Sequence, residues 1–319
     1  MAFLFLVAGM VLILVGANFM TDGSAAIAKK LGISDFVVGL TIVATMTSAP
    51  ELVVSIISAV KNAPSLAIGN IVGSNIFNIL VIVGTVAVIK PIKVGKGMLT
   101  DDIPLVILSS AVLLVMGLSP QLDGNPMALT RVDGLILLLF FVVFMRYTLK
   151  QAKNHDATES ETEIKSLPVW RSLLYVAGGL AALVYGGQLF VDGATGLAKA
   201  MGWSDGLIGL TIVAAGTSLP ELATSIVAAR KGLPGLCLGN VIGSCIFNVF
   251  FVLGLASTIL PMSFGNITLF DLIVMFGASV LFWICGRVIG QRTITRGEGV
   301  LMLACYVGYV IFLYLQLPS

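Results

Sequence analysis

The chain contains an internal repeat whose two copies lie 170 residues apart. Residues 32–58 align without gaps on residues 202–228, and 16 of the 27 positions are identical. The same offset places LAIGNIVGSNIFN, which begins at residue 66, on LCLGNVIGSCIFN, which begins at residue 236. Self-similarity at a fixed offset indicates a duplicated structural unit. Any fold of this chain is therefore expected to contain two related halves.

Most of the chain is too apolar for a soluble domain. Hydrophobic residues make up 58% and charged residues 11% of the sequence, against roughly 25% charged residues in soluble domains. A transmembrane helix needs about 20 mostly apolar residues, so we predict an all-α polytopic membrane protein with ten spans. The predicted spans are 2–20, 36–60, 66–89, 102–118, 131–149, 170–191, 206–229, 236–259, 268–288 and 298–316.

The ten predicted spans divide into two sets of five. Because five is odd, the second copy enters the membrane with the opposite orientation. We expect residues 1–149 to form the first five-helix repeat and residues 169–319 the second, joined by a polar cytoplasmic linker at residues 150–168. Two inverted five-helix repeats are typical of secondary transporters, whose site lies between the halves near the bilayer midplane.

The basic residues predict the orientation in the membrane. If the N-terminus lies outside, fifteen of the eighteen Lys and Arg residues fall on the cytoplasmic side, and only Lys61, Arg131 and Lys199 fall outside. Basic residues favour the cytoplasmic side, so both termini are expected outside. The first apolar stretch has no basic n-region and is too long for a signal peptide. With no organelle address, the expected location is the plasma (inner) membrane of a prokaryote.

Each repeat places a glutamate in the middle of an apolar span. Segment 44–55 reads ATMTSAPELVVS and segment 214–225 reads AAGTSLPELATS, which puts Glu51 and Glu221 at equivalent positions. A charged side chain at the bilayer centre costs roughly 2.5–3.5 kcal/mol on insertion scales. No Lys or Arg lies near the middle of any predicted span. We therefore expect a bound cation to balance the two carboxylates.

Further oxygen-bearing side chains surround these glutamates at helical spacing. The preceding prolines cannot donate the usual helical hydrogen bond, which predicts free carbonyls at 46–47 and 216–217. An oxygen-only site suits Ca²⁺, Mg²⁺, Mn²⁺ or Na⁺, and Ca²⁺ is expected first because it takes six to eight oxygens in flexible geometry. The polar side chains are Thr47, Ser48, Ser55, Asn70, Ser74 and Asn78 and their repeat counterparts Thr217, Ser218, Ser225, Asn240, Ser244 and Asn248.

These polar residues fall into two expected roles. We interpret Asn70 and Asn240 as interhelical hydrogen-bonding residues. The candidate ligands of the following spans are Ser74, Asn78, Ser244 and Asn248. Asp22 and Asp192, like Asp35 and Asp205, are also related by the repeat, and we interpret these as helix-capping or interfacial charges near span ends.

The motifs GTSLPE at 216–221 and GNVIGSCIFN at 239–248 resemble the alpha repeats of the sodium/calcium exchanger family, part of the calcium/cation antiporter superfamily. The resemblance covers nearly the whole chain and is closest to the compact prokaryotic members, with the motifs at 39–80 and 209–250. It implies Ca²⁺/Na⁺ antiport by alternating access, with Glu51 and Glu221 as central calcium ligands. The further ion-site positions that it implies are Ala44, Thr47, Ser48, Ser74, Asn78, Ala214, Thr217, Ser218, Ser244 and Asn248.

The chain departs from the family pattern at two positions. Met46 replaces the glycine of the first motif, and Asn248 stands where some exchangers carry an aspartate, which leaves two formal negative charges. The resemblance also implies a small sliding of the first and sixth spans. Glycines in these spans are expected to permit close packing: Gly9, Gly16, Gly178, Gly179, Gly186 and Gly187.

Three other functions are compatible with parts of this pattern. A glutamate partly removed from water can carry a proton, which makes proton-coupled Ca²⁺ exchange the alternative. An intramembrane hydrolase is disfavoured because the only histidine, His155, lies in the linker. A channel would use the glutamates structurally, and saturable countertransport separates a carrier from a pore. We expect no enzyme activity, no cofactor, no nucleic acid and no protein partner, only inorganic cations and the lipid bilayer, with a monomer as the simplest state.

Overall fold

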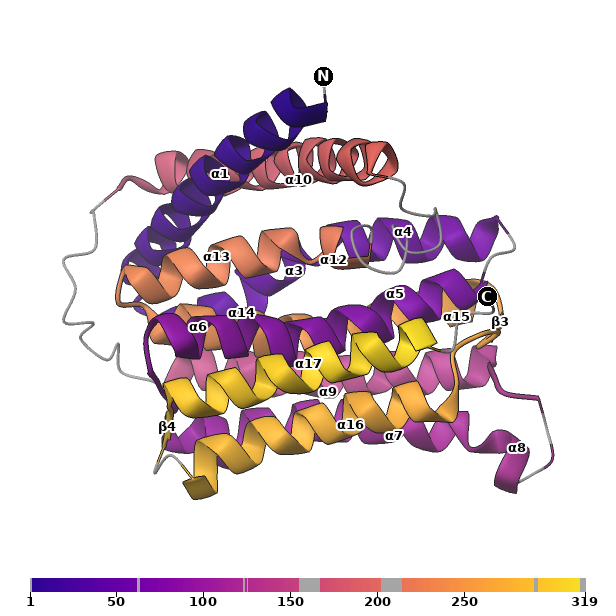
Figure 1. Cartoon of the computed structure of the whole chain (residues 1–319). Coiled ribbons are helices and arrows are strands. Elements are labelled where there is room, and N and C mark those ends of the chain that lie inside the picture. Colours follow the sequence, from indigo (N-terminus) through magenta and orange to yellow (C-terminus); the bar gives the residue numbers. More distant parts are fainter. Residues whose placement is uncertain are drawn as a thin grey trace.

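The computed structural model describes residues 2–61, 64–122, 124, 126–154, 167–201, 214–289 and 292–315. Within this part of the chain, eight helices are long and apolar enough to cross a membrane, and a bent pair of helices adds a ninth candidate span. Figure 1 shows the long helices side by side, with α1 and α10 together along one edge of the bundle. The predicted all-helical, multi-span architecture is confirmed.

Part of the prediction lies outside the described residues. The span predicted at 206–229 is described only from residue 214 onward, and most of the linker, including His155, is not described. Residues 209–213 of the second GLTIVA run and Asp205 also lie outside the described residues.

The first half contains the following elements, with π-helical segments labelled η. They are α1 (Ala2–Leu31), α2 (Asp35–Val38), η1 (Gly39–Val43), α3 (Ala44–Thr47), α4 (Ala49–Val60), α5 (Pro64–Phe77), η2 (Asn78–Val83), α6 (Gly84–Ile89), β1 (Ile92–Lys93), η3 (Met98–Asp102), α7 (Ile103–Gly117), α8 (Ser119–Leu122), β2 (Ala128–Leu129) and α9 (Arg131–Asn154).

The second half follows the same order at nearly the same offset. Its elements are α10 (Val169–Ala200), α12 (Ala214–Gly216), α13 (Leu219–Arg230), α14 (Pro234–Ile246), η5 (Phe247–Leu253), α15 (Gly254–Ile259), β3 (Met262–Ser263), α16 (Leu269–Ile284), η6 (Cys285–Ile289), β4 (Thr293–Ile294) and α17 (Arg296–Leu315).

The two halves are interlocked rather than set side by side. Helix α6 of the first half packs against α17 of the second, and α15 of the second packs in the same way against α9 of the first. Short antiparallel strand pairs join the halves, with Ile92 opposite Ile294 and Leu129 opposite Met262. In Figure 1, β4 and β3 lie at opposite ends of the bundle. The two halves of the repeat therefore contact each other through their helices and through strand pairs at both ends of the bundle.

Three spans begin with the same local arrangement, in which a threonine hydroxyl and an acidic side chain three residues later satisfy each other's backbone N–H groups. This capping box fixes where a helix starts, because it supplies partners for otherwise unpaired donors. The pairs are Thr130–Asp133 at α9, Thr268–Asp271 at α16 and Thr295–Glu298 at α17.

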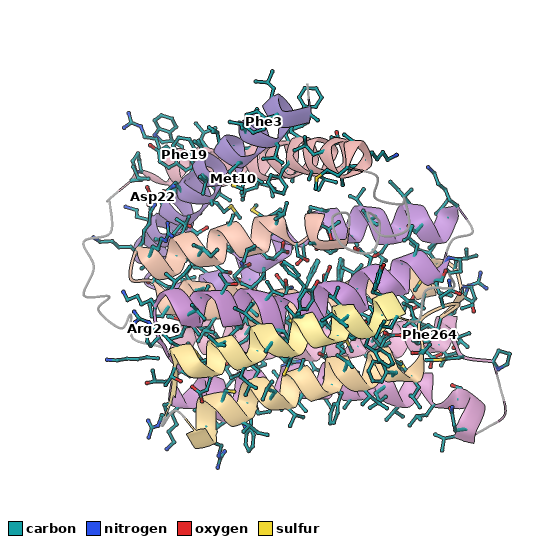
Figure 2. All side chains as sticks on the ribbon, viewed as in Figure 1. Phe3, Met10, Phe19, Asp22, Phe264 and Arg296 are labelled. Carbon is teal, nitrogen blue, oxygen red and sulfur yellow. The ribbon has the colours of Figure 1, made fainter. Side chains whose placement is uncertain are left out.

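The first and sixth spans are longer than the sequence predicts. Helix α1 continues to Leu31 and α10 to Ala200, because good helix formers such as alanine extend the helices beyond their most apolar part. Asp22 and Asp192 therefore lie inside helices, so the capping part of their interpretation as capping or interfacial charges is wrong. Asp22 instead pairs with Lys231 at 2.6 Å. Figure 2 shows Asp22 toward the same end of the bundle as Arg296.

Glycines bring α1 and α10 into backbone contact. A Cβ atom added to Gly16 would lie 2.8 Å from the carbonyl oxygen of Gly179, and one added to Gly179 would lie 2.8 Å from that of Gly16. Gly9 and Gly186 face the opposite helix in the same way, whereas a Cβ on Gly178 would meet nothing within 4 Å. The predicted close packing is confirmed for these four glycines and is wrong for Gly178. It is also not found at Gly187, where an added Cβ would lie 3.9 Å from the Gly216 carbonyl oxygen. The outer surface of α1 exposes large apolar residues such as Phe3 and Met10 (Figure 2), as expected of a lipid-facing helix.

Candidate functional site

Each predicted proline break is present in the structure. Helix α3 ends at Thr47, Ser48 has φ −83° and ψ 7°, and α4 begins again at Ala49 with a 42° bend. In the second half Ser218 has φ −91° and ψ 6° between α12 and α13. Proline is tolerated in the first turn of a helix but not in its interior. The two breaks are therefore the local consequence of Pro50 and Pro220.

The breaks place Glu51 and Glu221 in the first turns of α4 and α13. Both side chains are 0% exposed. The partial positive charge at a helix N-terminus stabilises a carboxylate in this position. Each glutamate is thus buried at the start of a helix that points its free N–H groups toward the same region.

Hydroxyl groups of the opposite half bind these carboxylates. Ser48 Oγ donates to Glu221 Oε1 at 3.0 Å, and Ser218 Oγ donates to Glu51 Oε1 at 3.2 Å. Ser74 Oγ, which belongs to the same half as Glu51, adds a bond of 3.3 Å to Glu51 Oε1. The two halves therefore bring their glutamates together through crossed hydrogen bonds.

Several buried oxygens around the glutamates have no hydrogen-bond partner in the described part of the chain. Such atoms are uncommon in folded proteins, and each costs about 1–3 kcal/mol when left unpaired. No Lys or Arg of the described residues forms an ion pair with either glutamate. The unpaired oxygens are Glu51 Oε2, Glu221 Oε2, Asn78 Oδ1, Ser244 Oγ and Asn248 Oδ1.

Asn70 and Asn240 tie the two halves together. The Asn240 amide nitrogen donates to the Glu221 carbonyl at 3.4 Å, and its Oδ1 accepts from Thr47 Oγ1 at 3.1 Å. Asn70 repeats this arrangement with the Glu51 carbonyl at 3.4 Å and Thr217 Oγ1 at 3.3 Å. The prediction that both asparagines hydrogen-bond between helices is confirmed.

The remaining predicted positions lie around the same breaks. Ala44 is buried in α3, and a Cβ on Gly243 would lie 2.6 Å from its Cβ, so Gly243 allows α14 to approach α3. Ala214 begins α12. Asn75 was not predicted as part of the site, although its Oδ1 accepts from the Asn248 amide at 3.1 Å. The repeat gave no signal for Asn75, because its counterpart is Cys245.

A cavity of about 510 Å³ lies beside both breaks, with Pro50 of the first and Pro220 of the second in its wall. Helices α4, α10 and α13 surround it, and its wall includes Val53, Val191, Gly216 and Thr217. At the first break the equivalent threonine, Thr47, is 0% exposed. Of the two equivalent threonines, Thr217 therefore lines the cavity and Thr47 does not.

The chain is similar to known proteins over almost its whole length. A family model described as sodium/calcium exchanger protein matches residues 1–150 and 171–315. The sodium/calcium exchanger MaX1 of Methanosarcina acetivorans is 33% identical over 98% of this chain and 98% of its own. The inner membrane protein YrbG of Escherichia coli is 34% identical over 98% and 97% of the two chains. The solved structure of the sodium-calcium exchanger NCX_Mj has a TM-score of 0.83 and 33% identity, covering 100% of this chain and 99% of that chain.

Proposed function

The chain belongs to the sodium/calcium exchanger family, and we propose that it exchanges Ca²⁺ for Na⁺ across the membrane, with both ions bound between Glu51 and Glu221. As a member of this family it is a multi-pass cation transporter and not an enzyme. The proposal rests mainly on one observation, which is the set of buried oxygens without hydrogen-bond partners around Glu51 and Glu221. A cation supplies the positive charge that two buried carboxylates require.

The proposed calcium ligands are the free carboxylate oxygens of Glu51 and Glu221, with the main-chain carbonyls of Thr47 and Thr217 exposed by the breaks. Ca²⁺ is bound by six to eight oxygens at about 2.3–2.6 Å, and neutral oxygens complete this number. We propose that Na⁺ uses overlapping ligands, so that the two ions compete. The neutral contributors are drawn from Ala44, Ser48, Ser74, Asn78, Ala214, Ser218, Ser244 and Asn248.

The charge of the site bears on the exchange ratio. With asparagine at position 248, two glutamates carry the formal charge, which one Ca²⁺ balances. If three Na⁺ exchange for one Ca²⁺, each cycle moves one net charge, worth about 2.3 kcal/mol per 100 mV. We therefore expect exchange that responds to membrane potential.

We propose alternating access between two inverted halves, residues 1–149 and 169–319. The cavity beside Thr217 corresponds to the open side, and the buried Thr47 to the closed side. The glycine contact between α1 and α10 would allow these helices to slide together over the rest of the bundle. We further propose that the protein lies in a prokaryotic inner membrane with both termini outside. In this orientation the cavity would lie toward the external face.

The proposal is tested by calcium flux into proteoliposomes that contain the purified protein. We expect an outward Na⁺ gradient to drive saturable Ca²⁺ uptake that changes with membrane potential. Uptake driven by a pH gradient in the absence of Na⁺ would instead support proton-coupled exchange. Uptake that does not saturate and needs no counter-ion would indicate a channel. The Glu51→Gln variant is the control for uptake through this site.

A further inference from the structure

The Asn75 side chain bridges the two halves beside the proposed cation site. Asn75 is 2% exposed and lies in α5. Its Nδ2 donates to the Cys245 carbonyl at 3.0 Å, and its Oδ1 accepts from Asn248 Nδ2 at 3.1 Å. Both partners belong to the second half of the chain.

These two bonds determine which way the Asn248 amide faces. A main-chain carbonyl can only accept a hydrogen bond, so it must face the NH₂ group of Asn75. The oxygen of Asn75 then faces Asn248, which must present its own NH₂ group in return. This leaves Asn248 Oδ1 as one of the buried oxygens without a partner among the described residues.

The first half has no equivalent of this arrangement. Asn78 is the repeat counterpart of Asn248, and Cys245 is the counterpart of Asn75. Neither the nitrogen nor the oxygen of the Asn78 amide has a hydrogen-bond partner in the described structure. The two central amides therefore differ, because the hydrogen bond that orients Asn248 has no counterpart at Asn78.

We propose that Asn75 is a positioning residue that holds the Asn248 amide with its oxygen toward the transported cation. The inference rests on the proposed function of the site. An amide turned by half a rotation would point two N–H donors at the cation instead of an oxygen. Groups that orient metal ligands in this way commonly change affinity by 10- to 100-fold when removed.

The test compares Asn75→Ala, Asn248→Ala and the double variant in Na⁺-driven Ca²⁺ exchange. We expect Asn75→Ala to raise the half-saturating Ca²⁺ concentration about tenfold, with the maximal rate within about twofold of wild type. In the Asn248→Ala background the same change should add nothing, because Asn75 acts through Asn248. Ser110→Ala is the matched control, because it removes another buried side-chain hydrogen bond between the halves, to Ser279 at 3.1 Å, and should behave like wild type.

Cation-dependent thermal stabilisation of the detergent-solubilised protein provides a reading that does not depend on transport. An equal loss of affinity in both backgrounds, or the same loss in Ser110→Ala, would assign the effect to packing and overturn the inference. An Asn75→Ala protein that responds to Ca²⁺ at the wild-type concentration would overturn it as well. A wild-type protein stabilised by neither Ca²⁺ nor Na⁺ would instead contradict the proposed function, and the inference with it.

Discussion

The Ser48 hydroxyl of the first half donates to the Glu221 carboxylate of the second half at 3.0 Å. Ser218 and Glu51 repeat this relationship at 3.2 Å. Each glutamate thus keeps one oxygen bound to the opposite half and one oxygen without a partner in the described structure. A cation bound at the free oxygens would therefore link both halves of the transporter.

Neutralising either glutamate is expected to abolish calcium exchange. In Glu51→Gln or Glu221→Gln, an NH₂ group replaces an oxygen ligand and one of the two balancing charges is lost. Calcium flux in proteoliposomes measures the effect. The matched control is Glu298→Gln, since Glu298 is also buried, but in the capping box of α17. Substantial exchange by either glutamine variant of the site would undo the assignment.

Removing the asparagine that ties the halves together is expected to destabilise the fold. Asn240→Ala leaves the Thr47 hydroxyl and the Glu221 carbonyl without this partner, which should cost about 1–3 kcal/mol. Thermal unfolding in detergent without Ca²⁺ measures it. Asn18→Ala is the control, because that amide makes one exposed bond within its own helix. Equal unfolding temperatures for the two variants would contradict the role of Asn240.

The repeat made the central part of the site predictable from sequence. A duplicated proline-glutamate pair in an apolar span fixes both the helix break and the buried charge, and the structure has both breaks where Pro50 and Pro220 predict them. Asn70 and Asn240 were also predictable, because amides at equivalent positions inside two apolar spans need partners there.

Other features depend on contacts between residues far apart in the chain. Asp22 and Lys231 are separated by 209 positions, and no local pattern indicates that they meet. The predicted ends of α1 and α10 were wrong because hydropathy shows which residues cross the bilayer and not where a helix ends. Asn75 was missed because the repeat substitutes a cysteine at the equivalent position.

The ion pair between Asp22 and Lys231 is expected to favour one of the two states of the transporter. In this state the cation site is closed toward the end of the bundle where the ion pair lies. The pair is 2.6 Å long, with side chains 20% and 29% exposed. Its repeat counterparts, Asp192 and Lys61, form no ion pair in the described structure. Asp22→Asn should keep exchange measurable but increase the population of the state that is closed at the other end. For a partly exposed ion pair the ratio of the two states should change by up to about fivefold.

Labelling of a cysteine placed in the cavity wall measures this shift. In a Cys305→Ala background, Val191→Cys should react more slowly with a water-soluble thiol reagent when Asp22→Asn is added, because the cavity closes more often. Cys305 is replaced because it is the one exposed cysteine among the four. Lys90→Ala removes an exposed basic residue at the end of α6, outside the proposed site, and serves as the control. Unchanged or faster labelling in Asp22→Asn would contradict this role of the Asp22–Lys231 ion pair.

Two adjacent glycines of α10 offer a matched test of the contact with α1. Gly179→Val would force its side chain against the backbone of Met20 and Gly16, whereas Gly178→Val would meet nothing within 4 Å. Overpacking of this kind costs about 1–3 kcal/mol. We expect Gly179→Val to lower the maximal exchange rate about tenfold or more and Gly178→Val to leave it nearly unchanged. Equal rates for the two variants would show that this contact does not govern transport.

The most direct test of a cation held between the two halves is anomalous diffraction from crystals soaked in Ca²⁺ without Na⁺. We expect the strongest peak within about 2.3–2.6 Å of both Glu51 Oε2 and Glu221 Oε2, and its loss after soaking in Na⁺ alone. A strongest calcium peak that touches neither glutamate would contradict the shared site.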